Sequence, residues 1–311
     1  MTSFITWSVI EGALELGLIY ALIALALFLT YSMLNVCDLS TDGCYTLGCA
    51  VGAVVAIAGH PVLAFFAAMG AGVVSGFINA FLQTKLEVES MLAGIIVNTG
   101  LYTINLAIMG KSVISMNDTE TVFTWMKKML EYTGAAGAYK LIVAAVFVAA
   151  VSVLMLWFLG TRLGLSIRAT GDNPDMVKSS SINPSFMTTV GLCIGGALTA
   201  LSGCLIGEYQ KSCDINMGTG MVTVALASLI IGETIFSKKS IRVRVFGVIF
   251  GSCLYRIIVA IALRFNLPAS ALKLVSAVIV AIAIAMPAIK RYAANRKIRR
   301  IAMRKRVSEG R

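Results

Sequence analysis

Long apolar segments limit the folds open to this chain more than any other feature of its sequence. A helix needs about 20 apolar residues to cross the hydrocarbon core of a bilayer, because it rises about 1.5 Å per residue. We expect spans at 9–30, 43–58, 61–82, 91–109, 141–160, 186–207, 219–236, 245–263 and 269–288. The segment 43–58 is short and rich in glycine, so it is either a span or a broken, re-entrant element that protein covers.

The composition favours a membrane protein over a soluble one. Hydrophobic residues make up 58% of the 311 residues and charged residues only 13%, whereas soluble domains carry about 25% charged residues. In hydrocarbon every backbone polar group needs an internal partner, which leaves helices or closed barrels. The alternation typical of barrel strands is missing from the sequence. We therefore predict an all-α, polytopic transmembrane helix bundle of about eight to ten spans.

The basic residues are concentrated at the C-terminal end and in a few loops. This pattern indicates membrane topology and not nucleic-acid binding, although the net charge is +11. If residues 291–311 form a cytoplasmic tail, the alternation of spans places 18 of the 26 Lys and Arg residues on that side and six on the other. The positive-inside rule then puts loops 83–90, 161–185 and 237–244 in the cytoplasm. We predict one transmembrane domain over residues 1–290, followed by the basic tail.

The sequence lacks the patterns of catalytic and metal sites. His60 is the single histidine, the seven cysteines form no CxxC pair, and acidic residues are scattered. We therefore predict no catalytic residues, no metal and no cofactor. Residues 105–112 (NLAIMGKS) resemble a phosphate-binding loop, but they lack its first glycine and end an apolar segment. If transport uses ATP, a separate subunit must hydrolyse it.

The polar segment 161–185 is the most informative of the predicted cytoplasmic loops. Asp172 or Asn173 can cap a helix that begins at Pro174, because proline suits the first helical position. Asp175 adds negative charge to the first turn of that helix. We expect a short surface helix flanked by turns. It either transmits a partner's motion into the bundle or is an ordinary amphipathic connector, and the residues alone leave both open.

Polar residues inside the expected spans are candidates for a translocation path, because such residues are costly in lipid and usually face protein or water. The residues that we predict to line the path are Asn79, Asn98, Thr99, Asn105 and Thr223. Asn98 and Asn105 are seven residues apart and therefore share one helix face. Charged residues in or near the spans are Glu11, Glu15, Glu233 and Arg256. Each of them lines the path, forms an interhelical hydrogen bond or is an end group that extends to the membrane surface, and Glu233 is a candidate partner for Arg256.

Two further patterns predict surface structure and packing. Within the predicted external loop 111–140, residues 122–130 favour a short helix in the membrane interface, with Trp125 at the headgroup level. An ordinary loop is the alternative. Glycines also recur four residues apart, which lets helix backbones approach closely. These pairs are Gly48 and Gly52, Gly72 and Gly76, Gly191 and Gly195, Gly203 and Gly207, and Gly247 and Gly251.

Residues 168–187 (RATGDNPDMVKSSSINPSFM) resemble the cytoplasmic coupling segment of ABC-importer permeases of the branched-chain amino acid and ribose type. In those permeases a stretch R-A-x-G-x-N-P precedes a glycine-rich helix. Here the matching stretch, residues 168–174, precedes the glycine-rich residues 191–207. Residues 18–53 and 84–112 resemble a subgroup assigned to tryptophan and tyrosine uptake. The likeness covers residues 12 to 290.

The sequence departs from these relatives at two places. The subgroup has Gly-Ser-Phe where this chain has Gly43-Cys44-Tyr45, which predicts an altered pore lining. The family has Gly-Ile where this chain has Ser181-Ile182, which predicts an altered turn in the coupling segment.

The resemblance implies a permease subunit of an importer in the bacterial cytoplasmic membrane, for a small solute such as an amino acid, in the subgroup an aromatic one. Its partners would be ATP-binding cassette ATPase subunits, a periplasmic or lipid-anchored substrate-binding protein, and a second permease copy, identical or related. The residues that would couple it to the ATPase are Arg168, Gly171, Asp172, Asn173, Pro174 and Asp175. The alternatives are an ion-coupled secondary transporter, which the scarcity of mid-span aspartate disfavours, and a membrane enzyme or scaffold.

Overall fold

The computed structural model describes residues 7–131, 139–236 and 240–264, together with isolated positions after 264. The expected ninth span, 269–288, and the tail 291–311 lie outside the described residues, apart from those isolated positions. In chain order, the elements are α1 (Trp7–Leu27), the π-helix η1 (Phe28–Met33), α2 (Thr41–Ile57), α3 (Pro61–Thr84), α4 (Ser90–Met109), β1 (Val113–Ser115), α5 (Val122–Glu131), α6 (Tyr139–Gly160), α7 (Arg162–Asp172), α8 (Pro174–Ser179), α9 (Pro184–Gln210), β2 (Ser212–Asp214), α10 (Met221–Phe236) and α11 (Ile241–Arg264).

The helices confirm the predicted all-α membrane bundle. Among the described residues, six helical stretches are long and apolar enough to cross a membrane: α1 with η1, α3, α4, α6, α9 and α11. The expected spans 43–58 and 219–236 correspond to α2 and α10, which are apolar but shorter, at 17 and 16 residues. At about 1.5 Å per residue these helices are about 24–26 Å long, against a hydrocarbon core of about 30 Å. Neither is therefore a full-length span.

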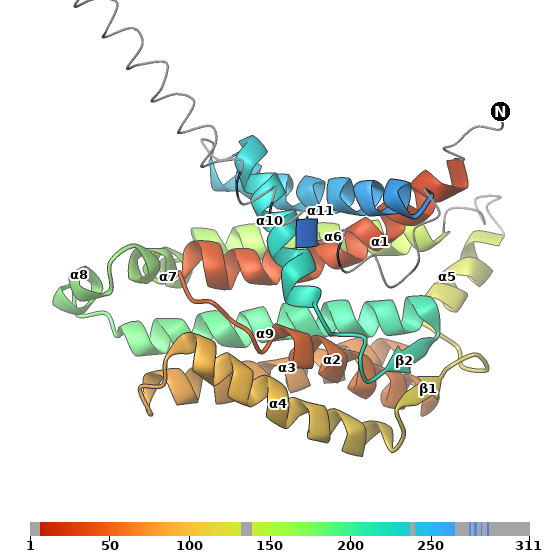
Figure 1. Cartoon of the computed structure of the whole chain (residues 1–311), viewed down its shortest axis with the longest axis horizontal. Helices are drawn as coiled ribbons and strands as arrows, with labels where there is room; N and C mark the ends of the chain where they lie inside the picture. The colour runs from red at the N-terminus through yellow and green to blue at the C-terminus, as the bar shows by residue number, and fades with distance from the viewer. Residues whose placement is uncertain are drawn as a thin grey trace, which may run out of the picture.

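Helices α1 and α9 form the centre of the bundle (Figure 1). Helix α9 lies between α1, α6 and α11 on one side and α2, α3 and α4 on the other. The apolar window of α9 is 83% buried, and that of α4 or α6 only 28%. The outer helices thus present apolar faces that suit lipid or another chain.

The connections sort to the two ends of the bundle as the charge pattern predicts. The α3–α4 turn and helices α7 and α8 lie at one end, and the β1–β2 pair and α5 lie at the other (Figure 1). The expected short helix at 122–130 is confirmed as α5. Glu120, just before α5, accepts a hydrogen bond from Trp125 Nε1 at 2.7 Å and pairs with Lys128. The Lys128 ammonium and the Trp125 donor lower the pKa of Glu120 below its usual value.

Several members of the glycine pairs mark places where helices touch through their backbones. A methyl group built on Gly48 of α2 would lie 2.0 Å from the carbonyl oxygen of Ala200 in α9. One built on Gly72 of α3 would lie 2.3 Å from the carbonyl oxygen of Gly196, also in α9. These distances leave no room for a side chain, so the spacing-based prediction of close backbone packing is confirmed here.

Candidate functional site

Helices α2 and α10 meet at their N-termini inside the bundle. After η1 the chain turns back through residues 34–40 and enters α2 among buried residues, Ser40 and Thr41 included. The Asp42 carboxylate, in the first turn of α2, accepts hydrogen bonds from the backbone N–H of Gly220 at 2.9 Å and of Val222 at 2.8 Å. Asp42 therefore caps α10 from a different helix, which satisfies donors that the first turn of a helix leaves unpaired.

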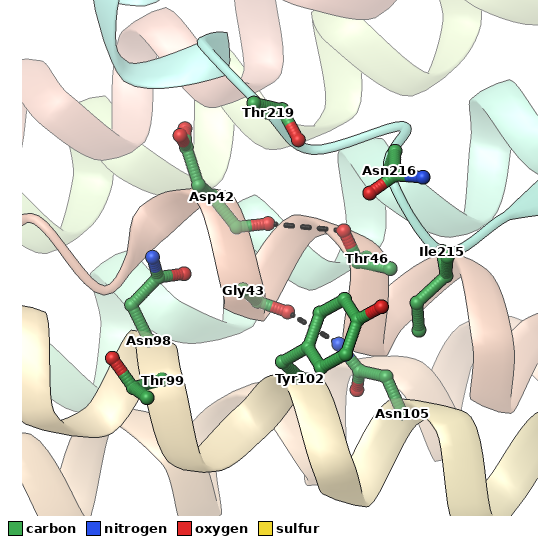
Figure 2. Close-up of a pocket in the computed structure, with 10 residues that line it drawn as sticks. All are labelled: Asp42, Gly43, Thr46, Asn98, Thr99, Tyr102, Asn105, Ile215, Asn216 and Thr219. Atoms are coloured by element: carbon green, nitrogen blue, oxygen red, sulfur yellow. Dashed lines mark hydrogen bonds between the residues drawn. The ribbon is translucent and has the colours of Figure 1, made fainter.

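A polar cavity of about 160 Å³ lies beside this meeting point. Three segments line it, as Figure 2 shows: the start of α2, one face of α4 and the loop that precedes α10. The lining residues are Asp42, Gly43, Thr46, Asn98, Thr99, Tyr102, Asn105, Ile215, Asn216 and Thr219. Only Asp42 among them carries a charge, and only Gly43 and Ile215 lack a polar side chain.

Asn98, Thr99 and Asn105, three of the predicted path residues, come together on this cavity (Figure 2). Asn105 is 1% exposed, and its Nδ2 donates to the carbonyl oxygen of Gly43 at 3.1 Å. This bond ties α4 to the start of α2, so the cavity wall has a defined shape.

The other two predicted path residues lie elsewhere. Asn79 of α3 is fully buried; its Nδ2 donates to Asp38 Oδ1 at 2.9 Å, and its Oδ1 accepts from Gln83 at 3.0 Å. Asn79 therefore supports the segment that leads into α2. Thr223 is exposed in the first turn of α10, one turn beyond Thr219, and does not line the cavity.

The hypothesis that Glu233 pairs with Arg256 is wrong. Glu233 pairs with Arg244 and accepts a hydrogen bond from Ser32 at 2.5 Å, and Arg244 also donates to Ser32 at 2.7 Å. The short connection between α10 and α11 brings Arg244 beside Glu233, whereas Arg256 lies about three turns further along α11. The Arg256 guanidinium instead stacks over the Tyr20 ring, with its central carbon 3.8 Å from the ring centroid.

Two more acidic residues bond near the end of the bundle that carries α5. Glu15 of α1 accepts a hydrogen bond from the Tyr209 hydroxyl at 2.8 Å. Glu208 of α9 is fully buried and accepts from the backbone N–H of Val122, the first residue of α5, at 2.9 Å. Both form bonds between elements and lie off the cavity. Glu11 is half-buried near the start of α1.

The predicted coupling segment consists of two consecutive helices. As expected, α8 begins at Pro174, and the cap is Asn173, whose Oδ1 accepts from the backbone N–H of Asp175 and of Met176, both at 3.1 Å. The expected turn before α8 is wrong, because residues 162–172 form α7. Thr161 starts α7 by accepting a hydrogen bond from the backbone N–H of Gly164 at 3.3 Å.

The two coupling helices differ in exposure, and α7 rests directly on η1. Asp172, Asn173, Pro174 and Asp175 are exposed, while Arg168 and Gly171 are partly buried. A methyl group on Gly171 would lie 2.1 Å from the carbonyl oxygen of Met33, the last residue of η1. Seven residues, 34–40, separate η1 from the helix that carries Asp42. The coupling helices and the cavity are thus joined by a short stretch of chain.

A family model described as the permease component of branched-chain amino acid transport systems matches residues 9–286. The chain belongs to this permease family. The match extends over the membrane helices described above, so the permease is a multi-pass protein of the cell membrane.

The permease is similar to several curated proteins over most of its length. It is 34% identical to the tyrosine transport system permease protein of Clostridioides difficile (strain R20291) over 265 residues, which cover 85% of this chain and 86% of the relative. It is 30% identical to an uncharacterised protein of Rickettsia prowazekii (strain Madrid E) over 281 residues, covering 89% and 97%. It is 24% identical to the ribose import permease of Escherichia coli (strain K12) over 220 residues, covering 69% and 65%. No solved structure matches the chain.

The two sequence departures have different structural outcomes in the permease. Cys44 and Tyr45 are buried in the core and do not line the cavity, whereas Gly43 does. The Cys44 thiol donates to the carbonyl oxygen of Gly196 at 3.4 Å. Ser181 has a φ of +61°, so it adopts the left-handed conformation that glycine prefers.

Sequence reasoning missed most of the cavity lining, including Asp42, Tyr102, Asn216 and Thr219. An aspartate directly before a glycine-rich apolar segment was a usable signal for Asp42. Asn216 had no such signal, because residues 208–218 have the composition of an ordinary external loop, and Thr219 is the first residue of the expected span 219–236. This segment returns into the bundle to start α10, and only the packing reveals this.

Proposed function

We propose that this permease forms the translocation path of an ATP-driven importer for an amino acid, with an aromatic amino acid as the first candidate. The observation that carries the proposal is the polar cavity at the meeting point of α2 and α10. Asn98, Thr99 and Asn105 would line the path. The C. difficile relative is named as a tyrosine transport permease, which supports an aromatic amino acid as the substrate.

A second permease copy would complete the path. Thr99, Tyr102, Asn216 and Thr219 line the cavity and are exposed in the single chain. Polar groups at membrane depth are costly against lipid. A facing copy, identical or related, would cover them and enclose a water-filled route, with Thr223 at its edge.

The coupling helices would receive the ATPase, which must be a separate subunit. The contact residues would be Arg168, Gly171, Asp172, Asn173, Pro174 and Asp175. Support comes from the exposure of residues 172–175 and from the Asn173 cap, which stiffens α8. The packing of Gly171 on Met33 would carry displacement of α7 to η1.

The remaining assignments follow the same orientation. The coupling end would face the cytoplasm, with residues 1–290 as the permease domain and 291–311 as a basic cytoplasmic tail. A periplasmic or lipid-anchored substrate-binding protein would dock at the opposite end, where α5 and the β1–β2 pair lie.

The direct test is uptake by the reconstituted complex. The permease is placed in liposomes with an ATPase subunit and a binding protein of the same transporter family, and uptake of labelled L-tyrosine, L-leucine and D-ribose is measured with ATP or a non-hydrolysable analogue. We expect uptake of an amino acid that requires ATP hydrolysis. Uptake by the permease alone under an ion gradient would instead identify a secondary transporter, and uptake of ribose alone would refute the amino-acid assignment.

The coupling residues need their own variant. We expect Asp172→Ala to lower both uptake and solute-stimulated ATPase activity, because it removes an exposed charge from the docking helices. Glu89→Ala, which removes an exposed charge from the α3–α4 turn at the same end but outside the coupling helices, is the matched control. Equal rates for the two variants would remove Asp172 from the contact.

A further inference from the structure

Asp42 is the one charged residue in the lining of the cavity, and its carboxylate can accept more hydrogen bonds than it does in this structure. The two oxygens of Asp42 accept one backbone N–H each, from Gly220 and Val222. A carboxylate offers about four lone-pair positions, so about two remain. Among the described residues, no Lys or Arg lines the cavity to occupy them.

The helix ends around Asp42 make the cavity nearly neutral as a whole. The N-terminus of a helix carries a partial charge of about +0.5, and α2 and α10 both begin here. Together they balance the single negative charge of Asp42. A solute with no net charge but with separated positive and negative groups therefore meets a matching field, while an ion of either sign meets less compensation.

The rest of the lining suits the negative group and the apolar part of such a solute. The side-chain amides of Asn98 and Asn216 and the hydroxyl of Thr219 are donors for a carboxylate. The Tyr102 ring and Ile215 supply apolar surface. The cavity volume, about 160 Å³, is close to the roughly 150 Å³ of a cavity that binds benzene, so an aromatic ring is compatible with it.

Asn105 adds an unpaired acceptor at the cavity wall. Its Nδ2 is used by Gly43, while its Oδ1 is buried and has no hydrogen-bond partner within the described part of the chain. A buried acceptor without a partner is costly. The oxygen is closed to solvent, so it acts on a solute through the negative end of its dipole, which favours an ammonium over a second carboxylate in the cavity.

We infer that Asp42 binds the primary ammonium group of a zwitterionic α-amino acid in this cavity, and that Asp42 thereby discriminates amino acids from their deaminated analogues. The inference rests on the proposed transport function, and it assigns to the permease a selectivity separate from that of any binding protein. It makes Asp42 a binding residue in addition to the cap of α10.

The test measures binding to the full-length permease in lipid nanodiscs, without partners. Three probes differ only in their charged groups: L-tyrosine, tyramine, which lacks the carboxylate, and 3-(4-hydroxyphenyl)propionate, which lacks the ammonium. We expect L-tyrosine and tyramine to bind about 10- to 100-fold more tightly than the deaminated acid, the range for a charged hydrogen bond. In Asp42→Asn, we expect L-tyrosine to weaken by that factor while the deaminated acid is unchanged.

Two further variants separate binding from folding. Asp42→Glu keeps the charge and should keep the preference for the ammonium, with weaker affinity. Asp38→Asn is the matched control, because Asp38 is a buried aspartate four residues away that bonds Ser40 and Asn79 and does not line the cavity. It should keep the wild-type preference. Thermal unfolding of each variant shows whether the fold is intact.

Two results would overturn the inference. One is an Asp42→Asn variant that still prefers L-tyrosine to the deaminated acid. The other is a wild-type permease that shows no saturable binding of L-tyrosine at millimolar concentration while the complete complex still takes it up with ATP. The second result leaves the proposed function standing, whereas loss of all ATP-dependent amino-acid uptake refutes the function itself.

Discussion

Gly171 is the position where one added methyl group should disturb the contact between the coupling helices and the core. In Gly171→Ala the new Cβ would lie 2.1 Å from the carbonyl oxygen of Met33 and 2.9 Å from two backbone carbons of Leu34. An ordinary carbon–oxygen contact is about 3.3 Å, so α7 and η1 must separate by roughly 1.2 Å. The obstacle is backbone and not a flexible side chain, so it cannot rotate away.

The magnitude follows from known costs of overpacking. Inserting a methyl group into a packed site typically costs about 1–3 kcal/mol. For a chain of this size that corresponds to a fall in the apparent melting temperature of about 2–10 °C. We also expect slower ATP-dependent uptake, because α7 loses its close packing against Met33 and Leu34, which lead to Asp42.

The assay compares two alanine variants of purified permease. Thermal unfolding is followed by tryptophan fluorescence, and uptake is measured in liposomes with the partner subunits. Gly160→Ala is the control, because Gly160 ends the preceding helix and a methyl group there would meet nothing within 4 Å. If Gly171→Ala unfolds and transports like Gly160→Ala, the direct contact between α7 and η1 does not transmit force.

Three more predictions follow from single contacts. Ser181→Gly should raise stability by about 1 kcal/mol, seen as a higher melting temperature, because glycine adopts the left-handed φ without strain; an unchanged or lower temperature would contradict this. Arg244→Ala should destabilise the permease by about 1–3 kcal/mol by leaving the partly buried Glu233 without its cation, while Lys178→Ala, which breaks an exposed pair, should change stability by less than about 0.5 kcal/mol; equal effects in thermal unfolding would refute the distinction. Asn173→Ala should remove the cap of α8 at a cost of about 1 kcal/mol and speed amide hydrogen exchange at residues 175–178, whereas protection equal to the wild type would show that the cap is dispensable.

The helices of the coupling segment illustrate what local sequence can predict. Asn173-Pro174 places a cap directly before a residue that fits the first helical turn, and the structure begins α8 there. The same reasoning did not predict the preceding helix α7, which contains two glycines, Gly164 and Gly171, and glycine is a poor helix former. Both glycines instead sit where backbones touch, at Phe158 and at Met33. Whether a glycine breaks a helix or packs it depends on a neighbour that the local sequence does not name.

The polar residues of the spans illustrate the limit more sharply. Asn79 and Asn105 are both buried asparagines in apolar helices, and the sequence treats them alike. Asn105 lies on the cavity, whereas Asn79 bonds Asp38 beneath the loop before α2. Polarity predicts that a side chain in lipid needs a partner. It does not predict which partner, because the rotation of each helix is set by its packing.

Hydropathy, charge bias and capping residues by themselves determined the membrane bundle, the assignment of loops to its two ends, and the start of α8, because each of these depends on neighbours within a few residues. Tertiary structure alone decided the cavity. It brought Asp42 to the first turn of α10, where Asp42 bonds Gly220, a residue 178 positions later in the chain. It also paired Glu233 with Arg244 instead of Arg256. The Asp42 contact arises where helices distant in sequence cross, and the crossing is set by shapes along their whole length, such as the close approach of Gly48 to Ala200 and of Gly72 to Gly196.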